Sequence, residues 1–473
     1  MLKRLTSNWI SFVGLLVVCV SAVFILFILI AAWLGFESNP YIGVIAFLVL
    51  PAFIVFGIIL IPLGKSWERR RLARAAGLPT GLIRFEINLD NARTRKRIIA
   101  TVVVTAVAFA FLGATTYKSM QFMDTTTFCG EVCHSVMEPE LTAYRHGPHA
   151  RVACVECHIG EGADWYVKSK LSGLGQVIAV TLDTYERPIL TPVRNLRPAR
   201  ETCEQCHWPE KFHSFKLVVK THYQDDSANT ALKNILLMKT GGGSPTLGGT
   251  AGIHWHMNIK NRVEYVALDY ARDTIPYIKM TDLNGRQTEY VSKDSPHTIE
   301  ELRTMPRRVM DCMDCHNRPA HTFEVPEVAV DGALVTGDLP SELPFLKREG
   351  TRILKEPYGS REDAARDIRV ALRSFYRAQY PELASSQADM IERAADVLVG
   401  IFQRNIFPDM AITWGTYRNF IGHTYSNGCF RCHDENHESP EGLSISQDCG
   451  ACHQLLAMDE ANPTPVLEDL PRR

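Results

Sequence analysis

Cysteine and histidine occur in this sequence in a repeated short pattern. Twelve of the 13 cysteines form six pairs, and a histidine directly follows the second cysteine of each pair. Five pairs have the spacing C-x-x-C-H, and the first has one additional residue between its cysteines. A random arrangement of 13 cysteines and 16 histidines in 473 residues would give about 0.01 copies of C-x-x-C-H. The pairs are Cys129/Cys133, Cys154/Cys157, Cys203/Cys206, Cys312/Cys315, Cys429/Cys432 and Cys449/Cys452.

This pattern is typical of covalent haem attachment. Two thiols a short turn apart can add to the two vinyl groups of one haem, and the next histidine then lies under the iron as an axial ligand. Disulfides or a thioredoxin-like site would explain the paired cysteines but not the histidine, and a zinc site needs four ligands. We therefore predict six haem c groups. Their motif ligands are His134, His158, His207, His316, His433 and His453.

A six-coordinate haem also needs a ligand on its second face, and ten histidines lie outside the motifs. This surplus favours bis-histidine haems, which suit electron transfer better than substrate binding. His321 and His437 closely follow motif histidines, so each is expected to ligate a neighbouring haem. His254 and His256 are expected on one face of a strand, where one ligates iron and the other contacts a propionate. The predicted second ligands are His149, His254, His256, His321, His423 and His437, and the alternative for each is a surface or propionate-contacting histidine.

The first motif differs from the other five. Met137 follows His134 by three residues and is a candidate ligand, because a thioether raises the potential of a haem relative to imidazole. Such a haem would suit the acceptance of electrons from a quinol, and the alternative is that Met137 packs against the haem. The unpaired Cys19 lies in an apolar run and is interpreted as a small buried hydrophobe.

Three apolar runs, at about 9–34, 41–63 and 98–115, are long enough to cross a bilayer or close to that limit. The first is too long for a signal peptide and lacks a cleavage site, so we interpret it as a retained anchor. The loop 64–97 is rich in lysine and arginine, which puts it and the N-terminus in the cytoplasm. A nucleic-acid partner would also explain a basic loop, but its juxtamembrane position and the net charge of −1 favour a topology signal. All six motifs then lie outside the cytoplasm, where bacteria attach haem.

The predicted fold is a membrane-anchored, mainly α protein with a periplasmic multihaem domain and a small β-rich insertion. A hairpin is expected at Asn284-Gly285, and amphipathic helices are expected at 362–379 and 385–402. The predicted divisions are a membrane domain at 1–115, a first haem domain at 116–215, a β-rich insertion at 216–305, the fourth haem at 306–344, a helical segment at 345–410 and the last two haems at 411–473.

The stretch 128–209 resembles the NapC/NirT family of membrane-anchored cytochromes, most closely the inner-membrane multihaem cytochromes of metal-reducing bacteria. The resemblance extends loosely to the three N-terminal spans and to the later haem sites. It is carried by Met137-Glu-Pro-Glu, Pro148-His-Ala-Arg-Val, Cys157-His-Ile-Gly, Lys170-Leu-Ser-Gly and Asn195-Leu-Arg-Pro.

Membership would imply a quinol dehydrogenase of the inner membrane, with menaquinol as substrate and periplasmic c-type cytochromes or other redox proteins as acceptors. Lys168 and Lys170 match the region where smaller relatives have a lysine beside the quinol, although lipid head groups or haem propionates are equally good partners. The acidic residue of those relatives is missing at the expected spacing, where Gln176 lies. The alternatives are a relay subunit fed by a larger complex and a terminal reductase with an open haem.

Overall fold

The computed structural model divides the chain into two compact units, Met1–His134 and Ser135–Arg473. Each is considered by itself below. The structure describes residues 8–33, 49–75, 90–132, 134–160, 162–193, 196–208, 212, 215–241, 252–257, 261–282 and 284–464.

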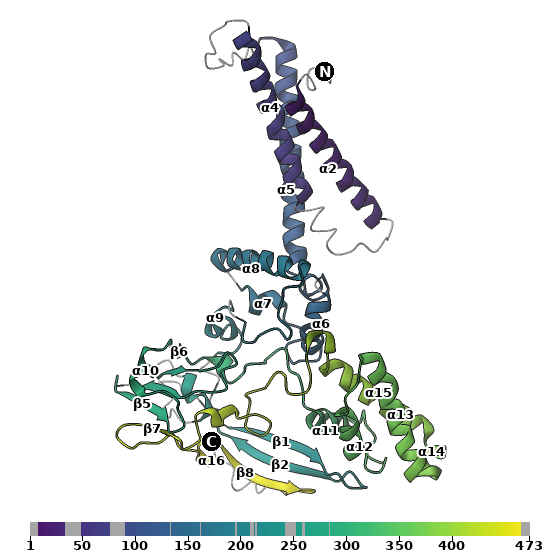
Figure 1. Cartoon of the computed structure of the whole chain (residues 1–473), viewed down its shortest axis with the longest axis vertical. Coiled ribbons are helices and arrows are strands. Elements are labelled where there is room, and N and C mark those ends of the chain that lie inside the picture. Colours follow the sequence, from purple (N-terminus) through teal and green to yellow (C-terminus); the bar gives the residue numbers. More distant parts are fainter. Residues whose placement is uncertain are drawn as a thin grey trace. The chain divides into compact units, whose positions relative to one another are not determined.

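The first unit contains three long helices, α2 (Trp9–Trp33), α4 (Leu50–Ala75) and α5 (Ala92–Met123) (Figure 1). Each includes a stretch long and apolar enough to cross a membrane, namely Trp9–Phe27, Leu50–Leu72 and Val102–Met123. The prediction of three apolar N-terminal helices is therefore confirmed, although two of them have different bounds.

The second and third candidate spans lie further along the chain than predicted. Helix α4 continues through the basic residues after Gly64, and residues 41–48 of the predicted run lie outside the described part. The third span begins after the arginines of the first turns of α5 and extends to Met123. Apolar runs locate a span in sequence, but a helix continues wherever its backbone hydrogen bonds are satisfied, so its ends do not follow hydropathy alone.

Helices α2 and α4 pack closely because glycines face each other at their contact. A Cβ atom at Gly57 would lie 2.6 Å from the carbonyl oxygen of Gly14, which leaves no room for a side chain. The Ser11 hydroxyl donates a hydrogen bond to the carbonyl of Ile61 at 2.9 Å. Small residues that allow close backbone approach, combined with interhelical hydrogen bonds, are the usual stabilisers of helix pairs in a membrane.

The second unit is mainly helical, and most of its helices are short (Figure 1). Helix η2 (Phe128–Val132) follows α5 in the first unit. The later helices are α6 (His134–Arg145), α7 (Cys154–His158), α8 (Ala163–Thr181), α9 (Ala199–Cys203), η4 (Ile253–Met257), α10 (Ile299–Thr304), η5 (Cys312–Asp314), α11 (Pro326–Thr336), α12 (Leu346–Leu354), α13 (Arg361–Gln379), α14 (Pro381–Ser386), α15 (Ala388–Asn405), η6 (Pro408–Met410), η7 (Gly428–Arg431) and α16 (Cys449–Cys452).

Two antiparallel sheets complete this unit. One has the strand order β1-β2-β8 and the other β6-β3-β4-β5-β7, so the C-terminal strands β7 and β8 each join strands from the middle of the chain. The predicted hairpin is confirmed: β4 and β5 pair antiparallel, and Gly285 in their turn has a φ of +78°. The strands are β1 (Lys216–Tyr223), β2 (Ala231–Met238), β3 (Arg262–Val266), β4 (Tyr277–Thr281), β5 (Gln287–Ser292), β6 (Arg308–Val309), β7 (His437–Glu438) and β8 (His453–Glu460).

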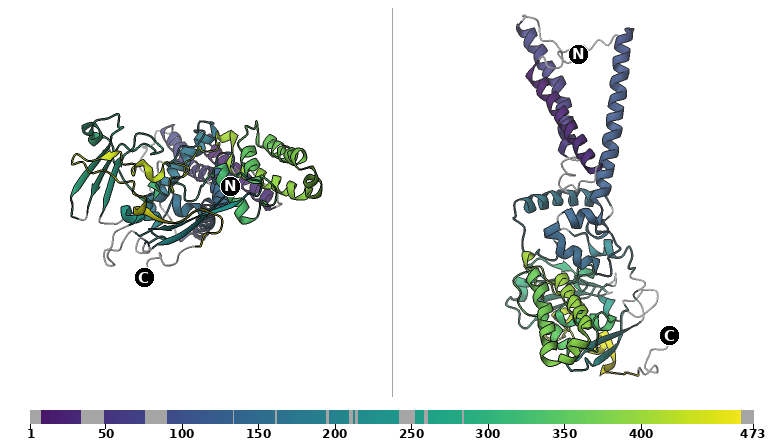
Figure 2. Two further views of the ribbon diagram at one scale, coloured as in Figure 1. Left: turned by 90° about the horizontal axis from the view of Figure 1, so that it is seen from below. Right: turned by 90° about the vertical axis from the view of Figure 1, so that its right-hand side faces the viewer.

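The main hydrophobic core lies among helices α11 to α15, where α13 and α15 lie side by side (Figure 2). The side chains of Leu372, Tyr376 and Leu398 are fully buried there, and the Tyr376 hydroxyl donates to the carbonyl of Pro344 at 3.0 Å. Both predicted amphipathic helices are confirmed. By contrast, helices α7 and α16, which carry cysteine motifs, contain no buried residue. The motif segments therefore lack the side-chain core that the helical segment has.

Candidate functional site

Each C-x-x-C-H motif after the first forms about one helical turn. The backbone amide of the motif histidine donates to the carbonyl of the first cysteine, at 2.8 Å for His207, 2.8 Å for His316 and 3.0 Å for His433. This turn brings both thiols and the imidazole to one side of a short segment, as attachment to a single haem requires. No disulfide joins any of the cysteines that the structure describes.

The two cysteines of the third motif differ in exposure. Cys203 ends α9 and is half-buried, whereas Cys206 lies in the turn after that helix and is exposed. The backbone amide of Cys206 nevertheless donates to the carbonyl of Cys203 at 3.1 Å, so the turn keeps the two residues close. The attachment role of Cys206 therefore rests on its spacing and not on burial, and it stays a prediction.

The histidines after the first motif come together in five pairs. Each pair joins one motif histidine to one histidine from outside the motifs. The distances between ring centres are 6.2 Å for His158 and His321, 6.1 Å for His207 and His149, 6.5 Å for His316 and His254, 5.9 Å for His433 and His256, and 6.4 Å for His453 and His423.

These distances fit two imidazoles on opposite faces of one iron. Metal–imidazole bonds are about 2 Å long, so the ring centres of two such ligands lie roughly 6 Å apart. Direct stacking would bring the rings closer, as for His254 on Phe212 at 4.4 Å. Among the described residues, no group of three or more histidine, cysteine or acidic side chains could hold a separate metal ion. The residues present therefore fit haem iron rather than a compact metal site.

Hydrogen bonds to the backbone orient four of the five outer rings. The Nδ1 atom of His149 lies 2.9 Å from the carbonyl of Pro319, that of His321 2.9 Å from Glu140, and that of His256 2.9 Å from Ile253. The Nδ1 atom of His254 lies 2.5 Å from the carbonyl of Thr240. Such contacts fix the tautomer, so that the opposite nitrogen, Nε2, has the lone pair that a metal binds.

His254 and His256 lie on the 3₁₀ turn η4 and not on the strand that was predicted. Gly252 permits this turn: its φ is +111°, and a Cβ there would lie 2.5 Å from the carbonyl oxygen of Lys239. The two rings consequently point to different partners, His316 and His433. The predicted strand is wrong at this position, and because a turn does not alternate its side chains as a strand does, both rings lie beside motif histidines.

His437 does not belong to this set. Its ring is buried, its Nδ1 atom lies 2.8 Å from the carboxylate of Asp434, and its Nε2 atom lies 2.7 Å from the carbonyl of Ile275. Both nitrogens are therefore engaged by the protein, which leaves neither of them for iron. We remove His437 from the candidate ligands and assign it a structural role beside the sheet that contains β7.

The first motif is described only in part. Cys129 lies in η2, with its thiol 3.8 Å from the carbonyl of Met123 at the end of α5, and Cys133 lies outside the described residues. His134 begins α6, and Met137 follows one turn later beside the buried Val136. Met137 is half-buried, and its role as a ligand remains a prediction.

The five later motifs follow one another in space in the order of the sequence. Helix α9 contacts both α7 and η5, and the thiols of Cys203 and Cys312 form a hydrogen bond. Burial and then the nearby Cys429 raise the pKa of Cys315 to about 12. Burial and then Cys429 also raise the pKa of Cys452. Neighbouring motifs are thus close enough for their cysteines to interact.

The histidines are held in the neutral form that ligates metal. Burial, followed by the charge of His321, lowers the pKa of His158 to about 4. Burial, followed by His254 and His207, lowers the pKa of His316 as well. At neutral pH both rings are therefore uncharged, as metal coordination requires.

Lys168 and Lys170 lie on α8, and they differ in exposure. The Lys168 side chain is exposed, with its ammonium 4.6 Å from the ring centre of Trp165, whereas Lys170 is half-buried. On the same helix Leu171, Leu174 and Ile178 form one face and are 66%, 59% and 52% exposed. Large apolar side chains exposed in a row indicate a surface that meets an apolar partner.

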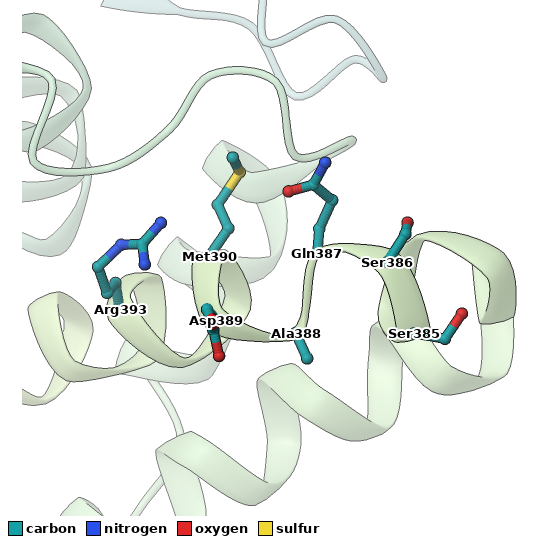
Figure 3. Close-up of a pocket in the computed structure, with 7 residues that line it drawn as sticks. All are labelled: Ser385, Ser386, Gln387, Ala388, Asp389, Met390 and Arg393. Atoms are coloured by element: carbon teal, nitrogen blue, oxygen red, sulfur yellow. The ribbon is translucent and has the colours of Figure 1, made fainter.

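Concave surfaces elsewhere lack redox chemistry. A pocket of about 390 Å³ lies where α14 meets α15 and is lined by small and polar residues, including Ser385, Gln387 and Arg393 (Figure 3). Its lining contains no cysteine or histidine. The cysteine and histidine arrangement is therefore the candidate functional site.

Two kinds of site residue could not be found from the motifs. Glu140 holds His321 by its backbone carbonyl, and its carboxylate lies 3.2 Å from the same ring. Arg431 and Asp314 each occupy the second of the two positions between the cysteines of their motif, and the Arg431 side chain contacts the backbone carbonyl of Asp314. Spacer positions carry no sequence signal, because haem attachment itself does not constrain them.

Comparisons with known proteins identify the family of the chain and two of its relatives. Residues 91–189 match the N-terminal region of the NapC/NirT cytochrome c family. The chain is 41% identical over 457 residues to the cytochrome c-type protein ImcH of Geobacter sulfurreducens, covering 96% of this chain and 89% of that protein. It is 29% identical over 116 residues to the cytochrome c-type protein NrfH of Wolinella succinogenes, covering 23% of this chain and 64% of that protein. No solved structure matches.

The molecule is therefore a membrane-anchored c-type cytochrome of electron transport, and its family implies haem c as the cofactor. The chain belongs to the NapC/NirT cytochrome c family.

Proposed function

We propose that this protein oxidises menaquinol and passes the electrons through six covalently bound haems to periplasmic acceptors. The observation that carries the proposal is the set of five histidine pairs with ring centres 5.9–6.5 Å apart, each containing one motif histidine. When bound, the haems supply the redox chemistry, because they accept single electrons and exchange them with close neighbours. The resemblance of residues 91–189 to its family supplies the substrate class.

The ligand assignment follows from the pairs. We assign His321 to the haem of His158, His149 to that of His207, His254 to that of His316, His256 to that of His433, and His423 to that of His453. Two imidazoles on each iron leave no position for a substrate at these haems. This pairing argues against a terminal reductase with an open haem among the five.

The chain's own residues are proposed to bind and orient the quinol. A lysine ammonium can donate a hydrogen bond to a quinol oxygen and stabilise negative charge there as a proton leaves. Lys168 is available for this role because its side chain is exposed beside the apolar face of α8, which a lipid-soluble substrate can approach.

Orientation in the membrane is also part of the proposal. The lysines and arginines at the end of α4 and in the first turns of α5 favour a cytoplasmic position for the segment that joins these two helices. The first motif follows the third candidate span by a few residues, so it and the later motifs would lie in the periplasm, at the inner membrane. An odd number of spans is what allows a cytoplasmic N-terminus and a periplasmic haem domain.

Replacing both Lys168 and Lys170 with glutamine should slow reduction of the protein by a menaquinol analogue by about tenfold or more, because general acid–base groups typically contribute at least that factor. Reduction by dithionite should be unchanged. Stopped-flow spectra of the purified protein in nanodiscs measure both rates. Lys293→Gln is the matched control, because Lys293 is exposed directly after β5 and forms a surface ion pair with Glu438. An unchanged quinol rate in the double variant would assign the lysines to lipid or propionate contacts instead.

The dehydrogenase and the relay subunit are separated by the same assay on the unmodified protein. A dehydrogenase is reduced by the menaquinol analogue alone, whereas a relay subunit stays oxidised until its partner complex is added. Absence of haem reduction by the analogue, in a preparation that dithionite reduces fully, would sink the dehydrogenase proposal.

A further inference from the structure

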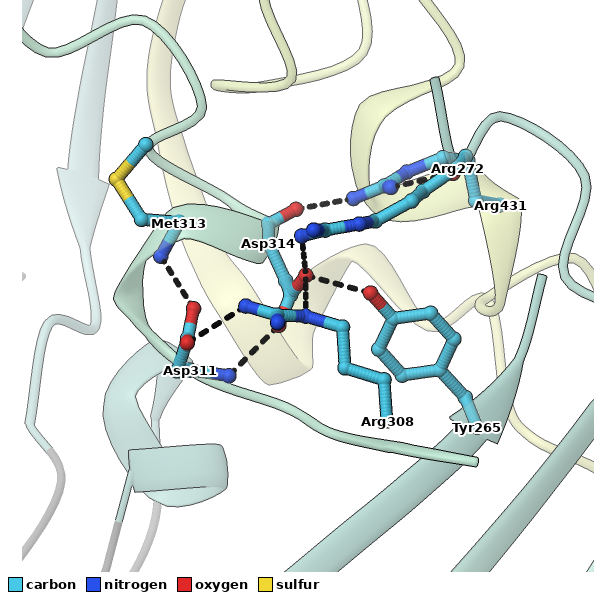
Figure 4. Close-up of polar contacts among 7 residues, drawn as sticks. All are labelled: Tyr265, Arg272, Arg308, Asp311, Met313, Asp314 and Arg431. Atoms are coloured by element: carbon cyan, nitrogen blue, oxygen red, sulfur yellow. Dashed lines mark hydrogen bonds and ion pairs between the residues drawn. The ribbon is translucent and has the colours of Figure 1, made fainter. Parts of the chain in front are cut away.

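The fourth and fifth C-x-x-C-H motifs are joined through the residues between their cysteines. Asp314 lies between Cys312 and Cys315, and Arg431 lies between Cys429 and Cys432. A terminal nitrogen of Arg431 donates to the carbonyl oxygen of Asp314, so each motif contacts the other directly (Figure 4).

Arg431 is fixed in place by contacts on every side of its guanidinium. It is 9% exposed, its Nε donates to the carbonyl of Gly428 at 2.8 Å, and its Nη1 donates to the carbonyl of Arg272 at 2.8 Å. The guanidinium also lies over the ring of Phe420, 3.8 Å from its centre. The side-chain nitrogens of Arg431 thus donate to carbonyls of Gly428, Arg272 and Asp314, so the guanidinium links the segments that contain these residues.

The buried carboxylate of Asp314 is neutralised by other arginines. Its Oδ1 atom accepts from Arg272 at 2.9 Å, from Arg308 at 3.1 Å and from the Tyr265 hydroxyl at 2.5 Å. Its Oδ2 atom accepts from the backbone amide of Asp311 at 2.7 Å. Asp314 is 2% exposed, so these bonds compensate it almost completely without the Arg431 side chain.

Arg431 differs from these arginines because it makes no ion pair with any residue that the structure describes. Its partners are carbonyl oxygens, which satisfy its donors but do not cancel its charge. The charge lies close to both motifs, because Arg431 directly precedes Cys432 in the chain and donates to the carbonyl of Asp314, which directly precedes Cys315. A buried, unneutralised cation therefore lies beside two haem attachment sites.

We propose that Arg431 is a shared positioning residue for the haems of the fourth and fifth motifs, which holds the two attachment segments together and raises the reduction potential of both haems. A reduced haem carries one more electron than an oxidised one, so a nearby positive charge stabilises the reduced form. The inference rests on the proposed attachment of haem at these motifs. The inference adds that the haems of the fourth and fifth motifs are held in a fixed position relative to each other.

The test is a potentiometric titration of the full-length protein in nanodiscs, followed by optical and electron paramagnetic resonance (EPR) spectra. Arg431→Gln should lower the potentials of two of the haem transitions and leave the others unchanged. Arg431→Lys retains the charge but not the forked donor geometry, so its potentials should lie closer to those of the unmodified protein. Arg366→Gln is the matched control, because Arg366 lies exposed on α13 and forms only surface ion pairs.

Asp314→Asn provides an independent arm with the opposite sign. The amide keeps the shape of the side chain but leaves Arg272 and Arg308 without their buried carboxylate, so the same two transitions should shift upward. If Arg431→Gln does not retain its haems, the potentials measured for Asp314→Asn decide whether the inference holds.

Two results would overturn the inference: unchanged potentials in Arg431→Gln with all haems bound, or equal shifts in the glutamine and lysine variants. If Arg431→Gln loses its haems and the test depends on Asp314→Asn, unchanged potentials of all haem transitions in Asp314→Asn would overturn the inference. Haem content, measured by pyridine haemochrome spectra and by mass, separates these outcomes from a failure of the proposed attachment. If attachment itself is wrong, the unmodified protein lacks haem at these motifs.

Discussion

Replacing His321 with alanine should convert one low-spin haem of the oxidised protein into a high-spin or water-ligated haem, while the number of covalently bound haems stays the same. His321 is the outer partner of His158, with ring centres 6.2 Å apart, and no other histidine pair of the described residues includes that motif ring. Loss of one strong-field imidazole leaves a weaker ligand field on that iron. EPR measures the new high-spin signal, and denaturing mass spectrometry measures the haem count.

His146→Ala is the control for this change. His146 is exposed on the segment after α6, and its Nδ1 atom lies 2.8 Å from the carbonyl of Thr142, four residues earlier; among the side chains that the structure describes, no motif histidine pairs with it. This variant should show no high-spin signal beyond that of the unmodified protein. His437→Asn should lower stability, because it breaks the buried contacts to Asp434 and Ile275, but should leave all haems low-spin. A high-spin signal in His437→Asn, or its absence in His321→Ala, would contradict the ligand assignment.

Replacing Cys449 and Cys452 with alanine should remove one haem and reduce electron delivery to an external acceptor to the background rate. Reduction of the remaining haems by a quinol analogue should continue. The physical reason is position: this motif lies at the end of the motif order, where Cys452 interacts with Cys429 of the preceding motif. Mass spectrometry checks the haem loss, and a soluble cytochrome or a dye that accepts electrons reports the delivery rate.

The corresponding change at Cys312 and Cys315 is the comparison. This motif lies between those of Cys203 and Cys429, so its loss should leave haems beyond it oxidised when quinol is the donor. Dithionite should still reduce every haem in both variants. Undiminished delivery in the Cys449/Cys452 variant would show that electrons leave the protein from another haem.

The attachment sites could be predicted because haem chemistry constrains adjacent residues. Two thiols and an imidazole must lie within one turn, and the sequence shows that spacing directly. Spacing does not report exposure, however, so the difference between the half-buried Cys203 and the exposed Cys206 could not be foreseen. The long apolar runs and the amphipathic helices at 361–379 and 388–405 were as predictable as the motifs, since periodic burial is a local property.

The second ligands could be nominated from sequence but not paired. His321 is positioned by the backbone of Glu140, 181 residues earlier, and no local pattern reports such a contact. His437 follows the motif histidine His433 by four residues, which made it a plausible ligand of a neighbouring haem. Both of its ring nitrogens nevertheless contact protein oxygens, those of Asp434 and Ile275. The turn at His254 depends on Gly252, whose lack of a side chain permits contact with a distant loop. Tertiary packing decides each of these cases.

The most direct test of the central claim is an EPR spectrum of the oxidised full-length protein, with haem content measured on the same sample. The claim is that five histidine pairs ligate five of six haems. The rings of His254 and His316 are inclined by 2°, whereas those of His256 and His433 are inclined by 88°. Near-parallel rings give an ordinary rhombic low-spin signal, and near-perpendicular rings give a highly anisotropic one.

We therefore expect six haems per chain and both kinds of low-spin signal, with at most one haem, that of Cys129, outside the bis-histidine class. Fewer than six haems, or high-spin signals from more than one of them, would contradict the account.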